Sequence, residues 1–183
     1  SNNINKVNEI KKILNNSNIE IVSPQEFNLN FIPKENGKSF AENAKIKSTY
    51  GFKELKIPCV ADDSGISIEA LGWRPNIHSR NFIEKFQNKE ECLKYIINKA
   101  QTTGKRKAFF QTYICYTLKK NYNICFKGEI RGRISDKILG KRGFGYDPIF
   151  IPEGSLKSFG EMSSFEKNLL SHRAIAIKKF ISF

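Results

Sequence analysis

The sequence is poor in the residues that build disulfide frameworks and histidine-based metal sites. It has only two histidines, and its four cysteines, at positions 59, 92, 115 and 125, include no Cys-x-x-Cys pair. Three of these cysteines have apolar neighbours in the sequence, which is typical of a core. We therefore expect neither a disulfide framework nor a structural zinc site. Any bound metal should be a hard ion held by carboxylates and phosphates, namely Mg²⁺, with Mn²⁺ as the alternative.

Long apolar runs are also missing. No stretch approaches the roughly 20 residues of a membrane span, and no signal-peptide pattern opens the chain. These absences predict a cytoplasmic protein without a membrane partner. With 183 residues, 39% apolar content and 15 phenylalanines, the chain can form one domain, or two small lobes, with a substantial core.

Acidic residues are scarce relative to basic ones. The chain has 31 lysines and arginines against 18 aspartates and glutamates, which gives a formal net charge of +13. Such a charge attracts polyanions, including nucleotides and nucleic acids. Frequent Lys, Asn and Ile are also typical of an A/T-biased genome, and no continuous basic run with interleaved aromatics is present. Nucleic-acid binding is therefore the minor interpretation.

The most informative stretch is residues 57–65, where a short apolar run is followed by two carboxylates, a hydroxyl and a glycine. The pattern predicts a buried strand end, then a turn over residues 62–65 and a second, paired strand over residues 66–71. Because side chains alternate along a strand, Asp62 and Asp63 should point in different directions. By itself the stretch is more typical of an Asp-Ser-Gly turn than of a metal site.

Polar residues precede the first predicted helix. Apolar residues recur at helical spacing up to Leu14, and a strand is predicted over residues 18–22. The free N–H groups at the helix start, together with a lysine in the first turn, are suited to holding a phosphate. The alternative is that Ser1 or Asn3 caps the helix and that Lys6 is solvated.

Residues 39–42 match a capping box that begins a second helix, with Gly51 as its expected end. Glu42 then has a structural role, because its side chain can accept a hydrogen bond from the backbone N–H of Ser39. Metal ligation beside Asp63 is the functional alternative. The local sequence favours the capping role.

Helices and strands alternate in the middle of the chain. Residues 72–88 have the composition of a loop, and residues 89–100 have the apolar spacing of an amphipathic helix. Residues 107–118 are rich in β-formers and should form a hairpin with residues 122–135. This mixture predicts an α/β protein with a mixed sheet.

The loop at residues 140–148 combines three glycines, two aromatics and a carboxylate. Glycines allow close backbone approach to a ligand, and Phe144 and Tyr146 offer rings to a base. Asp147 precedes a proline, which restricts its backbone and fixes the direction of its side chain. A purely structural loop is equally consistent with the sequence.

Residues 163–167 begin another capped helix. Lys167 and His172 are about 140° apart on a continuous helix, so they share a face only if the helix breaks. Ser171 can begin a new helix with His172 and Arg173 in its first turn, where two cations oppose the helix dipole and favour a bound anion. The alternative is a basic surface turn.

Together these stretches resemble the inosine/xanthosine triphosphate pyrophosphatase (ITPase-like) family. The match extends over nearly the whole chain, through five motifs in the family's order at residues 1–9, 39–44, 61–65, 143–150 and 166–173. The resemblance implies that residues 1–183 form a single ITPase-like domain with two lobes. It also implies a long curved mixed β-sheet flanked by helices, an active-site cleft between the lobes, and a homodimer.

The resemblance implies hydrolysis of non-canonical purine nucleoside triphosphates (ITP, dITP, XTP) to the monophosphate and pyrophosphate, which removes them from the nucleotide pool. Two alternatives remain. One is a related nucleotide pyrophosphatase with a different base preference, and the other is a non-catalytic, basic nucleic-acid-binding module.

The family also implies roles for individual residues. Mg²⁺ would be held by Glu42 and Asp63 with Asp62 as their neighbour, and Asp63 and Lys6 would be the catalytic residues. The substrate-binding residues would be Ser1, Asn2, Asn3, Ile4, Asn5, Lys6, Ser64, Phe144, Gly145, Tyr146, Asp147, Lys167, His172 and Arg173.

Base selection is part of the same implication. Phe144 would stack on the purine, while His172 and Arg173 would donate to its 6-oxo group. Adenine carries a donor at that position, so the facing donors would be left without acceptors and adenine would be rejected. The chain departs from the family's pattern at residues 75–82, where its arginine is displaced by one position, and at Arg142, which replaces a glycine.

Overall fold

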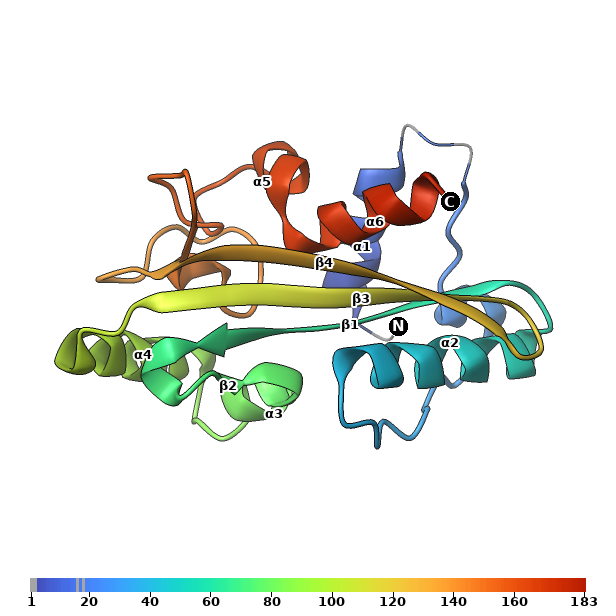
Figure 1. Cartoon of the computed structure of the whole chain (residues 1–183), viewed down its shortest axis with the longest axis horizontal. Helices are drawn as coiled ribbons and strands as arrows, with labels where there is room; N and C mark the ends of the chain where they lie inside the picture. The colour runs from blue at the N-terminus through green and yellow to red at the C-terminus, as the bar shows by residue number, and fades with distance from the viewer. Residues whose placement is uncertain (1–2, 16, 18) are drawn as a thin grey trace. The chain divides into compact units, whose positions relative to one another are not determined.

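The structure is a computed structural model that describes residues 3–15, 17 and 19–183 (Figure 1). The chain divides into two compact units. Unit 1 comprises Ser1–Asp63, Thr112–Gly128 and Arg173–Phe183, and unit 2 comprises Ser64–Gln111 and Glu129–His172. Three of the strands continue from one unit into the other, so each unit contains part of the sheet.

The helices of the described chain are mostly short and amphipathic. The α-helices are α1 (Ile4–Leu14), α2 (Phe40–Leu55), α3 (Ser79–Ile83), α4 (Lys89–Thr103), α5 (Ser164–Leu170) and α6 (His172–Ile181). Four 3₁₀ helices cover Pro24–Phe27, Glu69–Leu71, Asn76–His78 and Asp147–Ile149. None of the described helices has the length and apolar character needed to cross a membrane.

Five strands form one sheet in the order β2-β1-β3-β4-β5. They are β1 (Cys59–Ile68), β2 (Arg74–Pro75), β3 (Lys107–Lys119), β4 (Tyr122–Ile134) and β5 (Phe150–Pro152). At the edges, Ser67 pairs with Pro75 and Arg133 pairs with Ile151, both antiparallel. The predicted α/β class with flanking helices is confirmed, and the sheet is antiparallel throughout, which is more uniform than the mixed sheet that we expected.

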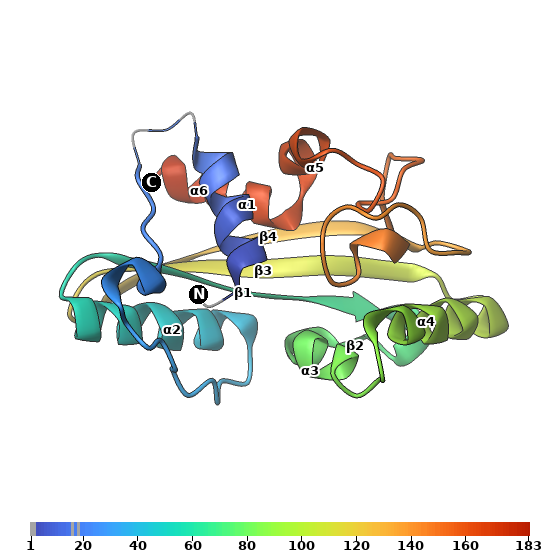
Figure 2. The same cartoon turned by 180° about the vertical axis from the view of Figure 1, so that it is seen from behind.

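Both faces of the strands in unit 1 are covered. Helices α1 and α6 lie on one face and α2 lies on the other (Figures 1 and 2). The apolar face of α1 packs with α6 and β3 in a cluster of Ile10, Leu14, Ile114, Ala176 and Ile177. Asn3 caps α1, since its Oδ1 accepts hydrogen bonds from the N–H groups of Asn5 (3.1 Å) and Lys6 (3.4 Å).

The strand predicted over residues 18–22 is not formed in its described part, residues 19–22. The alternating isoleucines that suggested it, Ile19 and Ile21, pack against the unit 1 core without pairing to the sheet. Burial of the apolar side chains alone therefore accounts for the pattern.

Helix α2 does not end at Gly51 as we predicted. It continues to Leu55 and ends at Lys56, which adopts the left-handed conformation (φ 59°). A Cβ atom at position 51 would lie 3.1 Å from the sulfur of Cys59. The glycine therefore serves close packing between α2 and β1, and the prediction that it terminates the helix was wrong.

The predicted turn at residues 62–65 is also wrong, because β1 runs without interruption from Cys59 to Ile68. Of the residues 66–71 that we expected to form its partner, the first three belong to β1 and Glu69–Leu71 is a 3₁₀ helix. The paired strand is the short β2. Most of β1 is buried, so the sheet and its covering helices hold the Asp-Asp-Ser-Gly sequence extended despite its preference for turns.

Unit 2 has its own core. The apolar side predicted for α4 is buried and packs with Phe110, Phe150 and Phe159. It consists of Cys92, Leu93, Ile96, Ile97 and Ala100. The predicted hairpin of β3 and β4 is present, with its turn at residues 120–121. Residues 72–88 are more ordered than the expected loop, since they contain β2, a 3₁₀ helix and α3.

One pair of cysteines is linked, which the sequence did not lead us to predict, although the four cysteines form no disulfide framework. Cys115 of β3 and Cys125 of β4 form a disulfide across the hairpin, whereas Cys59 and Cys92 are free thiols. The two positions are ten residues apart in the sequence, and the hairpin turn brings them together. Sequence spacing alone does not show this pairing.

Candidate active site

Asp62 forms the centre of a buried group of alternating charges in unit 1. Its Oδ2 lies 3.1 Å from Lys6 Nζ of α1 and 3.3 Å from Arg173 Nη2 of α6. The other terminal nitrogen of Arg173 pairs with Glu9 of α1. The side chains of Asp62 and Arg173 are 0% and 1% exposed. We call Asp62, Lys6, Arg173 and Glu9 the Asp62 cluster; it has two positive and two negative charges.

The charges of this cluster hold Asp62 ionised. Burial by itself would raise the pKa of Asp62, but the neighbouring Lys6 and Arg173 outweigh it and the net pKa is lowered. Burial lowers the pKa of Lys6, and Asp62 opposes that change. Asp62 is therefore a permanent anion at neutral pH that fixes two cations in place.

Asp63 has a different set of partners. Its Oδ1 accepts a hydrogen bond from Lys47 Nζ at 2.7 Å, and its Oδ2 accepts one from Asn43 Nδ2 at 3.3 Å. Lys47 also donates to Glu35 Oε2 at 3.0 Å. These four residues are the Asp63 cluster, and they lie within unit 1. Thr112 of β3 adds a hydrogen bond to the backbone oxygen of Asp63 at 3.1 Å.

The two adjacent aspartates therefore point to different helices, as the alternation along a strand predicts. Asp62 contacts residues of α1 and α6, whereas Asp63 contacts residues of α2. Burial raises the pKa of Asp63, and Lys47 offsets this only in part, so the net pKa is raised. Neighbouring carboxylates whose pKa values are shifted in opposite directions are typical of acid–base sites.

Sequence analysis missed Asn43 and Lys47. Both are buried although they are polar, and their i, i+4 spacing on α2 places them on one face of the helix. The i, i+4 spacing of an amide and an ammonium group could have pointed to these two residues. The sequence does not show which side of α2 faces the sheet, so the spacing alone did not mark them as buried.

Glu42 is exposed, and its observed contact is structural. Its Oε2 accepts a hydrogen bond from the N–H of Lys38 at 2.7 Å, while Ser39 Oγ accepts one from the N–H of Glu42 at 3.2 Å. The predicted capping role is therefore present, with the return bond displaced from Ser39 to Lys38.

The donor set suits a hard cation, but the described residues contain no group of three or more His, Cys, Asp or Glu side chains able to hold a metal. Asp62 pairs with Lys6 and Arg173, and Asp63 pairs with Lys47, so two of the three predicted metal ligands already contact cations of the protein. Magnesium is commonly held by one or two protein carboxylates and substrate phosphates. A magnesium ion that binds together with a nucleotide therefore does not require a group of three protein carboxylates.

The opening motif contributes the start of α1. Asn3 caps the helix, Ile4 and Asn5 are exposed in its first turn, and Lys6 is engaged by Asp62. The predictions for Ser1 and Asn2 lie outside the described residues. Ser64, the last of the predicted residues near the aspartates, is a partly buried position of β1 in unit 2.

The glycine-rich loop of unit 2 is organised by Asp147, which is 3% exposed. Its Oδ2 accepts hydrogen bonds from the N–H of Phe144 at 2.7 Å and from Lys167 Nζ at 2.8 Å. Gly143 has φ 73°, and a Cβ atom there would collide with the Asp147 carboxylate. Lys167 Nζ lies 5.0 Å from the ring centre of Phe144 and 5.3 Å from that of Phe159. We call Asp147, Lys167 and the two rings the Asp147 cluster.

The two aromatic residues of this loop differ in exposure. Tyr146 is buried in the unit 2 core, and its hydroxyl donates to the backbone oxygen of Ser79 at 2.6 Å. Phe144 is partly exposed, and the neighbouring Gly145 has φ 56°. Tyr146 therefore supports the loop, and Phe144 is the ring of this pair that a base can reach.

A helix break at Ser171 separates α5 from α6, as the sequence predicted. His172 stacks on Phe110 with ring centres 4.8 Å apart and ring planes 8° from parallel. The next residue, Arg173, joins the Asp62 cluster instead. We expected a bound anion beside this pair of cations. For Arg173, the anions are the Glu9 and Asp62 carboxylates of the protein itself.

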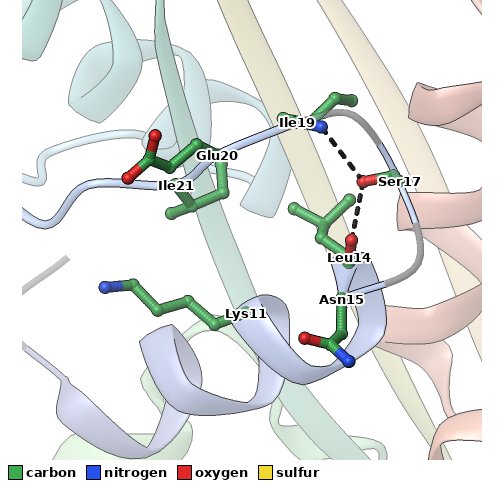
Figure 3. A pocket seen from close by; sticks show the side chains of 7 residues that line it. All are labelled: Lys11, Leu14, Asn15, Ser17, Ile19, Glu20 and Ile21. Atoms are coloured by element: carbon green, nitrogen blue, oxygen red, sulfur yellow. Dashed lines mark hydrogen bonds between the residues drawn. The ribbon is translucent and has the colours of Figure 1, made fainter.

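A surface hollow in unit 1 shares no residue with these clusters (Figure 3). Ser17 organises its rim by donating to the backbone oxygen of Leu14 at 2.7 Å and accepting from the N–H of Ile19 at 3.4 Å. Its lining residues are Lys11, Leu14, Asn15, Ser17, Ile19, Glu20 and Ile21. The perturbed titratable groups lie elsewhere, so the candidate site is the set of buried charges and not this hollow.

Comparisons with known proteins find relatives over the whole length of the chain. The Ham1 family model matches residues 1–183. A protein from Aquifex aeolicus (strain VF5) named dITP/XTP pyrophosphatase is 37% identical over 96% of this chain and 90% of its own. One of the same name from Christiangramia forsetii is 35% identical over 99% of this chain and 94% of its own.

Solved structures show the same relationship. A HAM1 protein from Coxiella burnetii superposes with a TM-score of 0.87 at 31% identity, and the Staphylococcus aureus Ham1 protein superposes with a TM-score of 0.86 at 33% identity. Each match covers 100% of this chain and 94% of the other.

Proposed function

This chain belongs to the Ham1 family, and we propose that it hydrolyses non-canonical purine nucleoside triphosphates such as dITP, ITP and XTP to the monophosphate and pyrophosphate. Relatives named dITP/XTP pyrophosphatase match it over nearly its full length. The structural observation that carries the proposal is the pair of adjacent aspartates with separate partners and opposite pKa shifts.

Asp63 is the general base in this proposal. Its raised pKa makes it a better proton acceptor than an ordinary aspartate, and Lys47 and Asn43 fix its orientation. A water molecule gives a proton to Asp63 as its oxygen bonds to the α-phosphorus. The bond from that phosphorus to the bridging oxygen breaks, and pyrophosphate leaves with the bonding electrons.

Asp63 and Glu42, with Asp62 adjacent, would hold Mg²⁺ or alternatively Mn²⁺, which when bound neutralises phosphate charge and activates water. The other phosphate ligands come from the start of α1. Lys6 lies in its first turn, where the helix dipole favours an anion, while the N–H groups of Asn5 and Lys6 donate to Asn3. Asp62 positions Lys6 for this contact.

The Asp147 cluster is assigned to the base. Phe144 provides a ring for stacking, and Asp147 fixes both the loop backbone and Lys167. We assign His172 as the residue that donates a hydrogen bond to the 6-oxo group of the base, because the guanidinium of Arg173 is held by Glu9 and Asp62. By resemblance to the family, we also propose a homodimer in the cytoplasm.

A substrate panel tests the activity. Pyrophosphate release is measured with Mg²⁺ for dITP, ITP and XTP against dATP, ATP and dTTP. We expect kcat/KM to favour the 6-oxopurine nucleotides by at least about 100-fold. Equal turnover of dTTP would support the related pyrophosphatase with another base preference. No turnover, with salt-sensitive RNA binding, would support the non-catalytic module.

The Asp63→Asn variant tests the mechanism. We expect kcat to fall about 1,000-fold with an unchanged circular dichroism spectrum, because Asn keeps the size of the side chain but is a poor base. Asp136→Asn, at an exposed aspartate of unit 2, is the matched control and should retain activity. Retained activity in Asp63→Asn would exclude Asp63 as the base.

A further inference from the structure

The cysteine pair of the hairpin is chemically asymmetric. Cys115 is fully buried, whereas its disulfide partner Cys125 is exposed. Exchange with a dissolved thiol or disulfide requires access to one sulfur. Cys125 provides that access, and Cys115 does not.

The two free cysteines are poorly suited to the same chemistry. Burial raises the pKa of the Cys59 thiol, and it raises that of Cys92 to about 11. The thiolate is the reactive form, so both thiols react slowly at neutral pH. Thiol exchange on this chain is therefore directed to the hairpin pair.

The pair lies on the segment of β3 that supports the Asp63 cluster. Thr112 of this segment bonds the backbone oxygen of Asp63, and Thr117 Oγ1 donates to Ser48 Oγ of α2 at 2.9 Å. Between them, the sulfur of Cys115 lies 3.6 Å from the backbone oxygen of Ala41, also in α2. A crosslink at Cys115 therefore acts on the contact between β3 and the helix that carries Asn43 and Lys47.

We propose that Cys115 and Cys125 form a reversible thiol–disulfide site that exchanges with small-molecule disulfides and thiols of the glutathione type. In oxidation, the Cys125 thiolate attacks a glutathione disulfide and releases one glutathione thiolate. The Cys115 thiolate then attacks the Cys125 sulfur and releases the second. The protein loses two electrons and two protons, and one glutathione disulfide becomes two glutathione molecules. In reduction, a glutathione thiolate attacks Cys125 and the steps reverse.

The oxidised form should be the more stable one. The disulfide closes the hairpin and reduces the conformational freedom of the unfolded chain. For a loop of this size we expect the oxidised protein to melt about 5 °C above the reduced one. The stiffer hairpin also restrains the strand that bonds Asp63.

The test is a redox titration of the full chain without nucleotide. The protein is equilibrated in buffers from reduced glutathione alone to glutathione disulfide alone, quenched with acid, and labelled with a maleimide that adds mass after unfolding. We expect four labelled thiols at the reduced end and two at the oxidised end, with the change occurring as one two-thiol step.

Variants assign the step. Cys125→Ser should abolish both the two-thiol step and the difference in melting temperature, whereas Cys59→Ser should retain both. Four labelled thiols in glutathione disulfide alone would show that no pair forms, and two in excess reduced glutathione would show that the pair is not reversible. Either result overturns the proposal. None of these measurements depends on nucleotide turnover. Failure of the thiol–disulfide proposal can therefore be distinguished from failure of the proposed pyrophosphatase activity.

Discussion

The Asp62 and Asp147 clusters each contain a buried lysine–aspartate pair, but their surroundings differ. In unit 1, the Lys6–Asp62 pair is completed by two further charges, Arg173 and Glu9. In unit 2, the Lys167–Asp147 pair is completed by two aromatic rings and a backbone N–H group. In the Asp62 cluster, the ion pair is stabilised by further ionised side chains. In the Asp147 cluster, the ion pair is stabilised by the two aromatic rings and by the backbone N–H group of Phe144.

This difference indicates which part of a nucleotide each cluster suits. A buried ion pair is costly to desolvate, and it is retained where additional charges or hydrogen bonds compensate for that cost. In the Asp62 cluster Lys6 is the cation that we assign to a phosphate, whereas a ring beside a fixed lysine favours a flat, polar base. The comparison therefore makes separate predictions for stability, substrate affinity and pH dependence.

The largest expected effect is on stability and compares Asp62→Asn with Asp147→Asn. Removing the Asp62 charge leaves Lys6 without its carboxylate and Arg173 with one of two, so we expect a loss of about 3–5 kcal/mol in the free energy of unfolding. An asparagine at 147 can still accept from the N–H of Phe144, and the rings remain beside Lys167, so about 1–3 kcal/mol is expected there. Urea unfolding at pH 7 measures both. Equal losses would remove the distinction between the clusters.

The next effect is on substrate affinity and concerns Phe144→Ala. Loss of base stacking should raise KM for dITP about tenfold with little change in kcat, because one stacked base contributes about 1–3 kcal/mol. Phe165→Ala is the matched control, since Phe165 is an aromatic residue of the same unit that is 74% exposed. Steady-state kinetics measures both variants. A loss of kcat without a change in KM would place Phe144 outside base binding.

The smallest expected effect is a shift in pH dependence for Lys47→Met. The charge and hydrogen bond of Lys47 lower the pKa of Asp63, so their removal should raise that pKa further. The base acts in its ionised form, so activity falls as the pH drops through its pKa. The acid limb of kcat/KM should therefore move to higher pH. Lys94→Met, at an exposed lysine, should leave the limb in place, and an unmoved limb in Lys47→Met would argue against Asp63 as the titrating base.

The parts of the fold that depend on local pattern could be predicted from the sequence. The buried side of α4, the β3–β4 hairpin and the break at Ser171 all follow from periodicity or capping. The failures share one cause, which is that distant neighbours override local preference. Gly51 lies inside α2 because Cys59 packs against it, and the Asp-Asp-Ser-Gly stretch is extended because the sheet pairs with it.

The candidate site was predictable to a similar degree. Alternation along β1 correctly separated Asp62 from Asp63. The partners of each aspartate could not be predicted, because Glu9, Lys47 and Arg173 come from helices whose facing sides the sequence does not specify. The contact between Arg173 and Asp62 joins residues separated by 111 positions, and no local pattern carries that information.

The continuity of β1 through both aspartates has a consequence for how the gene can change. A point mutation in the strand alters one side chain, but a one-codon insertion or deletion upstream of Ala61 would turn the strand over. An insertion would move Asp62 to the position that faces α2, and a deletion would move Asp63 to the position that faces Lys6 and Arg173. In either case neither aspartate would keep its present partners. The segment that leads from α2 into β1 should therefore keep a fixed length in working descendants of this gene.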